Sequence, residues 1–322
     1  MTAIKNPALY AFDIPAAGPA VPVTGDLDQP APANTAFRWI HLDLGVPGVR
    51  EWISARVDPV VAHALTHEDT RPRCARHAGG LILILRGVNL NPGSDPEDMV
   101  SIRMWIDQDR IISVRIRRLM AVVALRETLE AGTGPRTVGG FVAALAAGLT
   151  ERMNPVITGL GDIVDDLEER SIEQPDGLRG DLADLRRETI MLRRYIAPQR
   201  DALMRLETDA VGLFDDAAGI SVRESVDRVT RMVEEMDLIR ERSAVLYDQI
   251  SDRRAEEMNR NMLVLSVVAA VFLPLGFLTG LLGVNIAGIP GADYPFAFLM
   301  FCIALVAIAG GLLWFFRKLK WI

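Results

Sequence analysis

The fold is decided by an uncharged stretch near the C-terminal end of the chain, Met262-Leu-Val-Leu-Ser-Val-Val-Ala-Ala-Val-Phe-Leu-Pro-Leu-Gly-Phe-Leu-Thr-Gly-Leu-Leu282. About 20 residues of α-helix, at ~1.5 Å each, cross the roughly 30 Å hydrocarbon layer of a bilayer. A second uncharged run covers residues 294–316 and carries Trp314 near its end, where an aromatic ring suits the membrane interface. The sequence therefore predicts two transmembrane helices, residues 262–282 and 294–316, joined by a loop of residues 283–293.

Basic residues lie on the outer flanks of both runs. They are Arg253, Arg254, Arg260, Arg317, Lys318 and Lys320, whereas residues 283–293 contain no Lys or Arg. Because short segments rich in Lys and Arg stay in the cytoplasm, we expect a multi-pass membrane protein whose basic flanks lie on the cytoplasmic side. Both termini, including a basic tail at residues 317–322, would be cytoplasmic, and the loop 283–293 would be periplasmic. Residues 1–7 show no basic segment followed by an apolar core, so we expect no signal peptide.

Composition narrows the function classes. The 322 residues hold 35 Lys+Arg against 42 Asp+Glu, a formal charge of −7, which argues against a nucleic-acid binder. Two cysteines, Cys74 and Cys302, cannot build a disulfide framework or a four-cysteine zinc module. The sequence has no nucleotide-binding motif and no nucleophile–base pair, so we expect neither ATP-driven pumping, nor an enzyme, nor a bound cofactor.

The residues before the membrane runs predict an α+β cytoplasmic domain. Residues 1–34 are rich in Ala and Pro and favour loops with at most one short strand. Strand patterns follow at residues 40–44, 81–85, 102–106 and 111–116, and helical patterns at 49–65 and 119–130. Breakers at residues 132–135 end this first domain, residues 1–135.

Long helices should connect this domain to the membrane. Residues 136–220 predict a helical hairpin region, whose clearest signal is one apolar stripe: Leu178, Leu182, Leu185, Leu192, Ile196, Leu203 and Leu206. Ser221-Val-Arg-Glu224 matches a capping box that would start the next helix. Because no Gly or Pro occurs from residue 222 to 270, we expect a stalk helix, residues 221–261, that continues directly into the first membrane helix.

Small and polar residues recur at steps of three and four along the first membrane segment, so they share one helix face. They are Asn259, Met262, Ser266, Ala269, Leu273, Gly276, Gly280 and Gly283. This face fits either a helix–helix contact or the wall of a pore, and a pore would need a ring of subunits. The following Gly283-Val284-Asn285 is either a helix C-cap with a tight turn or a segment whose backbone carbonyls approach a central axis, where the Asn285 amide adds an uncharged oxygen acceptor.

These motifs resemble the CorA superfamily of divalent-cation transporters, and within it the ZntB zinc-transporter branch, where Val replaces the Met of the usual Gly-Met-Asn. Thr70-Arg-Pro-Arg73 and Arg193-Arg-Tyr-Ile-Ala-Pro-Gln-Arg-Asp201 match that branch as well, and the resemblance runs from about residue 37 to 322. It implies a CorA-like homopentameric funnel in the lipid bilayer, with the first span lining the pore. It further implies zinc uptake coupled to protons, with Cd²⁺, Ni²⁺, Co²⁺ or Mg²⁺ as other possible ions. At Leu275-Gly276 this sequence departs from the family pattern, because relatives often carry hydroxyl side chains there.

The spans constrain how an ion could pass. Neither contains His, Asp or Glu, so we expect no dry zinc cage inside the membrane and expect the ion to keep much of its water. Asp293, repeated around a ring, would form an anionic collar at the outer mouth. The rival hypotheses are a Mg²⁺/Co²⁺ channel of the CorA type and a membrane-tethered sensor or scaffold without transport.

Two further groups could bind metal in the cytoplasmic part. His63, His67, Cys74 and His77 have spacings that zinc ligands use, although the arginines between them oppose a dication. An acid-rich stretch is either a solvated helix face or a divalent-ion sensor; it comprises Asp162, Asp165, Asp166, Glu168, Glu169 and Glu173.

Overall fold

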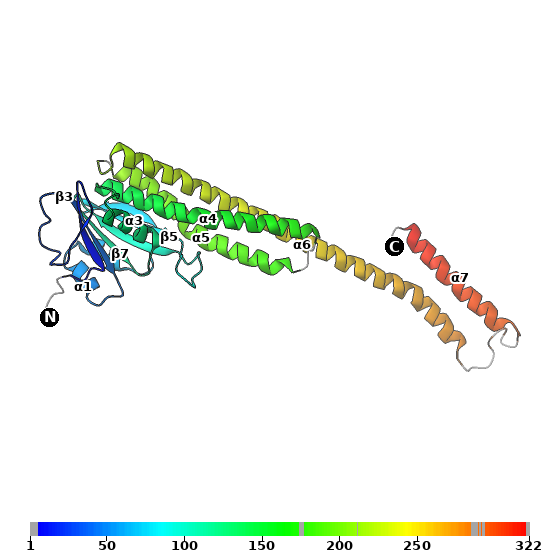
Figure 1. Ribbon diagram of the computed structural model, residues 1–322. Coiled ribbons are helices and arrows are strands. Elements are labelled where there is room, and N and C mark those ends of the chain that lie inside the picture. The colour runs from blue at the N-terminus through cyan, green and yellow to red at the C-terminus, as the bar shows by residue number, and fades with distance from the viewer. Residues whose placement is uncertain are drawn as a thin grey trace. The chain divides into compact units, whose positions relative to one another are not determined.

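The computed structural model describes residues 6–173, 177–210, 212–284, 289, 291 and 294–319. It divides into two compact units, Met1–Leu246 and Tyr247–Ile322. The first unit holds a seven-stranded sheet and its helices, and the second holds the apolar C-terminal part of the chain (Figure 1).

The sheet is mixed, with the strand order β2-β1-β3-β7-β6-β5-β4. Its strands are β1 (Tyr10–Pro15), β2 (Val21–Pro22), β3 (Thr35–Asp43), β4 (Arg73–His77), β5 (Gly80–Gly87), β6 (Val100–Ile106) and β7 (Arg110–Arg115). Among the described strands, β3 and β7 pair in parallel and the other neighbouring pairs are antiparallel.

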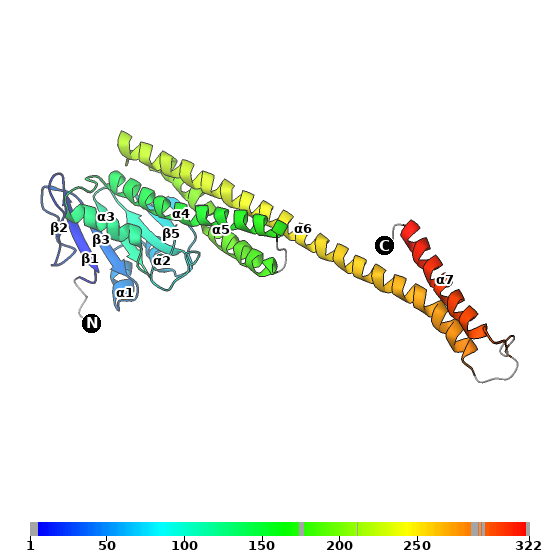
Figure 2. The same cartoon turned by 45° about the vertical axis from the view of Figure 1, so that its right-hand side comes forward.

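Helices cover both faces of the sheet (Figure 2). The short helices α1 (Val49–Ser54) and α2 (Pro59–Thr66) pack against Ile40 and Leu42 of β3. Side chains alternate along a strand, so Phe37 and Trp39 point to the other face, where both rings meet Phe141 of α4 (Val138–Glu173). Helix α3 (Met120–Glu130) packs on α4, and α5 (Leu178–Asp209) packs on β4 and β5.

The strands predicted at residues 40–44, 81–85, 102–106 and 111–116 are confirmed, but the sheet is wider than expected. Residues 1–34 contribute two strands, β1 and β2, where at most one was expected. Strand β1 forms because residues Tyr10 to Ile14 pair in register with β3. Residues 73–77, where the sequence pattern predicted no strand, form the edge strand β4 against β5. In both cases pairing with a neighbouring strand supplies the backbone hydrogen bonds that the local sequence does not signal.

The apolar stripe predicted between residues 178 and 206 is confirmed on α5. All seven apolar residues of the stripe on α5 are buried. The next helix, α6 (Asp216–Leu282), is continuous as predicted but begins five residues before Ser221. The capping box is therefore wrong: Asp215 provides the cap, because its Oδ1 accepts the Ala218 N–H at 2.8 Å. Ser221 lies inside the helix, where its carbonyl accepts the Ser225 hydroxyl at 2.9 Å.

Among the residues that the structure describes, two helices are long and apolar enough to cross a membrane. They are α6, through its C-terminal part, and α7 (Ala297–Lys318). Helix α6 ends at Leu282, the predicted end of the first run, and α7 lies within three residues of the limits predicted for the second.

Candidate ion pathway

In the second unit, α7 covers one side of α6. Val267, Val271 and Phe316 form a small buried cluster, with Leu275 and Leu312 packed against it. Leu275, part of the departure from the family pattern, therefore points toward α7.

The residues predicted to line a pore lie on the opposite side of α6. At about 100° per residue, their mean direction is about 180° from the side that Val267, Val271 and Leu275 present to α7. In the single chain all eight members are exposed: Asn259, Met262, Ser266, Ala269, Leu273, Gly276, Gly280 and Gly283. A Cβ added to Gly276 or Gly280 would meet no atom within 4 Å, so packing within the chain does not demand glycine at either position.

The chain leaves α6 at Gly283. Its N–H donates to the Thr279 carbonyl at 2.9 Å, which closes the last helical turn. A Cβ at Gly283 would lie 2.9 Å from that same carbonyl oxygen, so glycine is needed for this close approach. Val284 follows and is 44 % exposed. Asn285 and Asp293, the predicted filter amide and outer collar, lie outside the described residues.

The two soluble motifs that supported the family resemblance meet at a buried arginine. Arg86 of β5 is 8 % exposed and donates from Nε and Nη2 to the Thr70 carbonyl, at 3.1 and 2.8 Å. Its backbone N–H donates to Gln199 Oε1 at 2.6 Å, and its guanidinium carbon lies 3.9 Å from the Tyr195 ring centroid. Burial lowers the pKa of Arg86. Through these contacts the Arg86 guanidinium and backbone link the segment after α2 and helix α5 to the sheet.

Sequence reasoning missed Arg86, because its partners are backbone carbonyls and a ring distant in the chain. The only available signal was a charged residue directly after the apolar run Leu81-Ile-Leu-Ile-Leu85. Arg103 of β6 lies nearby and is fully buried, with Nη2 donating to the Glu68 carbonyl at 3.0 Å. Burial, reinforced by the Arg86 charge, lowers the pKa of Arg103 to about 10.

The acid-rich stretch lies on α4, and ion pairs hold part of it. Arg242 of α6 contacts Asp165 at 2.6 Å and Glu168 at 2.6 Å. The hydrogen bond from Arg242 lowers the pKa of Glu168. Arg170 similarly contacts Asp166, at 3.1 Å. These contacts favour a helix surface neutralised by arginine over a metal sensor in this part of the stretch.

The structure separates the four histidine and cysteine residues that were candidate metal ligands. His63 and His67 are neighbours, with ring centroids 5.1 Å apart. His77 instead pairs through Nε2 with Asp58 Oδ1 at 2.7 Å. Cys74 is 2 % exposed in β4, and burial raises the pKa of its thiol to about 12. Within the described ranges, no three His, Cys, Asp or Glu residues lie close enough together to hold a metal ion.

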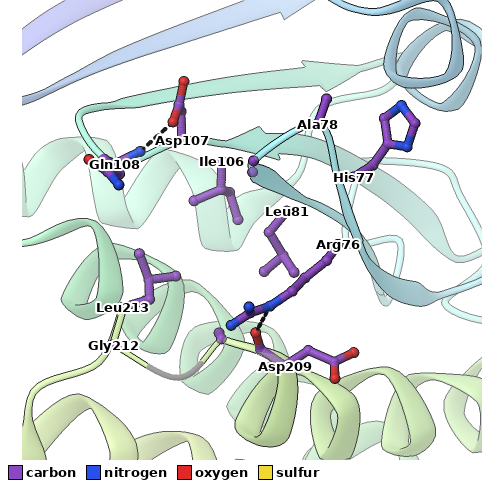
Figure 3. Close-up of a pocket in the computed structure, with 13 residues that line it drawn as sticks. Arg76, His77, Ala78, Leu81, Ile106, Asp107, Gln108, Asp209, Gly212 and Leu213 are labelled. Carbon is purple, nitrogen blue, oxygen red and sulfur yellow. Dashed lines mark hydrogen bonds between the residues drawn. The ribbon is translucent and has the colours of Figure 1, made fainter.

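A cavity of about 660 Å³ opens beside His77, between the β4–β5 turn, the β6–β7 turn and the end of α5 (Figure 3). Arg76 points across it and donates to the Asp209 carbonyl. Gln108 donates its N–H to Asp107 Oδ1 at 2.8 Å on the opposite wall. His77 is the one imidazole among the described residues of the wall, so we assign no metal chemistry to this cavity.

Known proteins resemble this chain over nearly its whole length. Residues 34–318 match the family described as CorA-like Mg²⁺ transporter protein. The divalent cation transporter CmaX of Pseudomonas aeruginosa is 43% identical over 289 residues, which cover 88% of this chain and 87% of that protein. The zinc transport protein ZntB of Pectobacterium atrosepticum is 36% identical over 317 residues, covering 98% of this chain and 96% of that protein.

The fold agrees with these similarities. The structure of the full-length CmaX protein superposes with a TM-score of 0.83 at 39% identity, covering 100% of both chains. The predicted architecture, an α+β domain followed by a long helix and a second apolar helix, is confirmed. The family match covers both the sheet domain and the two apolar helices, and the chain belongs to the CorA-like Mg²⁺ transporter family.

Proposed function

We propose that this protein transports divalent cations, zinc foremost, across the bacterial inner membrane as a homopentamer. Family membership carries this proposal, and relatives named as a divalent cation transporter and as zinc transport proteins support it. The two apolar helices α6 and α7 would anchor each subunit, with both termini in the cytoplasm.

The ion would pass between five copies of the α6 face that α7 leaves uncovered. Met262, Ser266 and Ala269 would form its inner part, and Leu273, Gly276 and Gly280 its outer part. Because this face carries no His, Cys, Asp or Glu, it lacks the ligands that usually bind zinc directly, so the ion would keep much of its water. The hydrated ion would meet Gly283, Val284 and Asn285 at the outer end, where carbonyl and amide oxygens contact the water shell. Asp293 would raise the local cation concentration outside.

Zinc uptake with protons is the form of transport we favour. The membrane segments lack a carboxylate or histidine that could relay protons, so any proton would move through pore water or the acids at the pore mouths. A Mg²⁺/Co²⁺ channel would use the same path, and the two differ in ion preference and in their response to a proton gradient.

Flux into liposomes tests the proposal. The purified full-length protein, reconstituted with an internal zinc indicator, should take up Zn²⁺ faster than Mg²⁺, and an inward proton gradient should increase the rate. Faster Mg²⁺ or Co²⁺ entry that ignores the gradient would identify the channel instead. If an intact oligomer transports no dication, the hypothesis that remains is a membrane-tethered sensor or scaffold.

A pair of asparagine variants tests the pathway. Asn285→Ala should reduce flux at least tenfold without changing the oligomer size measured by light scattering. Asn261→Ala is the matched control, because Asn261 lies about 100° around α6 from the predicted pore face and should keep its flux. Equal flux in wild type and Asn285→Ala would contradict the assignment of the filter.

A further inference from the structure

Two exposed imidazoles lie side by side at the C-terminal end of α2. His63 is in the last turn of the helix and His67 is the residue that caps it. The ring centroids are 5.1 Å apart with an interplanar angle of 60°. Both residues are exposed to solvent in the chain.

A hydrogen bond sets the tautomer of one ring. His67 Nδ1 lies 2.9 Å from the Asp69 carbonyl oxygen. Because a carbonyl only accepts, Nδ1 must carry the hydrogen and donate it, which leaves the Nε2 lone pair of the neutral ring free. Metal-binding histidines commonly have their other nitrogen held by a backbone carbonyl in this way, since it orients the ring.

Among the described residues, no third His, Cys, Asp or Glu lies close enough to these two rings to complete a three-ligand metal site. The Glu68 carboxylate accepts from Arg50 Nη2 at 3.0 Å. His77 is paired with Asp58, and Cys74 is buried in β4. The site therefore offers two protein nitrogens, and water would fill the remaining positions around an ion.

We propose that His63 and His67 form a surface site for a borderline transition-metal dication such as Zn²⁺. Two nitrogens at ~2.1 Å from a tetrahedral ion lie about 3.4 Å apart. The exposed His63 ring would turn about its side-chain bonds to bring a nitrogen to that distance, while the His67 ring keeps its hydrogen bond to the Asp69 carbonyl. Imidazole selects zinc, nickel and copper and discriminates against Mg²⁺, which prefers oxygen. With open positions occupied by water, the ion would exchange rapidly.

Equilibrium zinc binding to the full-length protein in detergent tests this site without any measurement of transport. Zinc per chain would be measured by equilibrium dialysis for wild type, His63→Ala, His67→Ala and the control His77→Ala. Each of the first two variants should lose one zinc equivalent per chain, because a single imidazole does not chelate. His77→Ala should retain it, and a hundredfold excess of Mg²⁺ should not displace it.

Several results would overturn the site. The site would be refuted if His63→Ala and His67→Ala bound as much zinc as wild type. It would also be refuted if Mg²⁺ displaced the zinc, or if His77→Ala lost as much zinc as the other two variants. Gln at either position, which keeps a polar side chain without an imidazole nitrogen, should reproduce the loss and separates it from misfolding. Asn285→Ala should keep the histidine-bound zinc whether or not it transports, so failure of this site and failure of the pore are distinguishable.

Discussion

Acidification should destabilise the folded chain through one buried histidine. His41 of β3 is 1 % exposed, stacks on Tyr10 at 4.8 Å and lies 2.7 Å from Ser113 Oγ through Nδ1. Burial, aided by the charge of Arg115, lowers the pKa of His41 to about 3. The imidazole is therefore neutral in the folded chain throughout the physiological range.

The sign and size of the effect follow from linkage. An unfolded chain binds this proton below about pH 6.5, whereas the folded chain resists it until near pH 3. Stability is thus fully present above pH 6.5 and falls as the pH drops through that window. At pH 5 the protonation of His41 in the unfolded chain makes the unfolding equilibrium constant roughly 30-fold larger than it is well above pH 6.5. This lowers the free energy of unfolding by about 2 kcal/mol per chain.

The assay compares wild type with His41→Gln, which cannot titrate. Urea unfolding of the full-length protein in detergent, followed by tryptophan fluorescence, would be measured at pH 7.5 and pH 5. Both proteins share the other histidines, so only the additional loss in wild type, about 2 kcal/mol, reports on His41. An equal loss in the two proteins would show that His41 is not held neutral, and the reasoning from burial would be refuted.

Three further outcomes follow from local geometry. Gly139→Ala should lower the free energy of unfolding, measured in urea, by about 1–3 kcal/mol, because the added Cβ collides with the Leu213 carbonyl. Gly159→Ala is the control, because a Cβ added there meets open space, and it should show no such loss. Ala78→Gly should raise that free energy by about 1 kcal/mol in urea unfolding, because Ala78 holds a φ of 43° in the β4–β5 turn, and no gain would argue against strain there. Cys74 should resist maleimide at pH 8 until the chain is unfolded, because its thiol is buried and its pKa is about 12; rapid labelling of native protein, located by mass spectrometry, would contradict this.

Patterns that repeat along the chain predicted most of the helical structure. The apolar run ending at Leu282 fixed the end of α6, and the stripe from Leu178 to Leu206 identified the buried side of α5. Such features depend on helical periodicity and composition, which a sequence displays directly. The strands of continuous apolar character, such as Leu81 to Leu85, were found for the same reason.

Features that depend on distant partners were not predictable in the same way. Strand β4 reads Arg-Cys-Ala-Arg-His and becomes a strand through pairing with β5. The pattern from Ser221 to Glu224 predicted the start of a helix, but the helix begins earlier in the chain, where Asp215 caps its N-terminus. Among the metal candidates, spacing alone could not separate His63 and His67 from His77, because the Asp58 partner of His77 comes from the other end of α2.

The side of α6 that α7 leaves uncovered, at Gly276 and Gly280, would have a thermodynamic consequence for the homopentamer proposed above. Enlarging either residue to alanine adds an atom that touches nothing in its own chain, so no clash within a dissociated subunit would oppose the change. Any penalty would arise only on association, and by mass action the measured defect would then vary with protein concentration and with dilution into excess detergent.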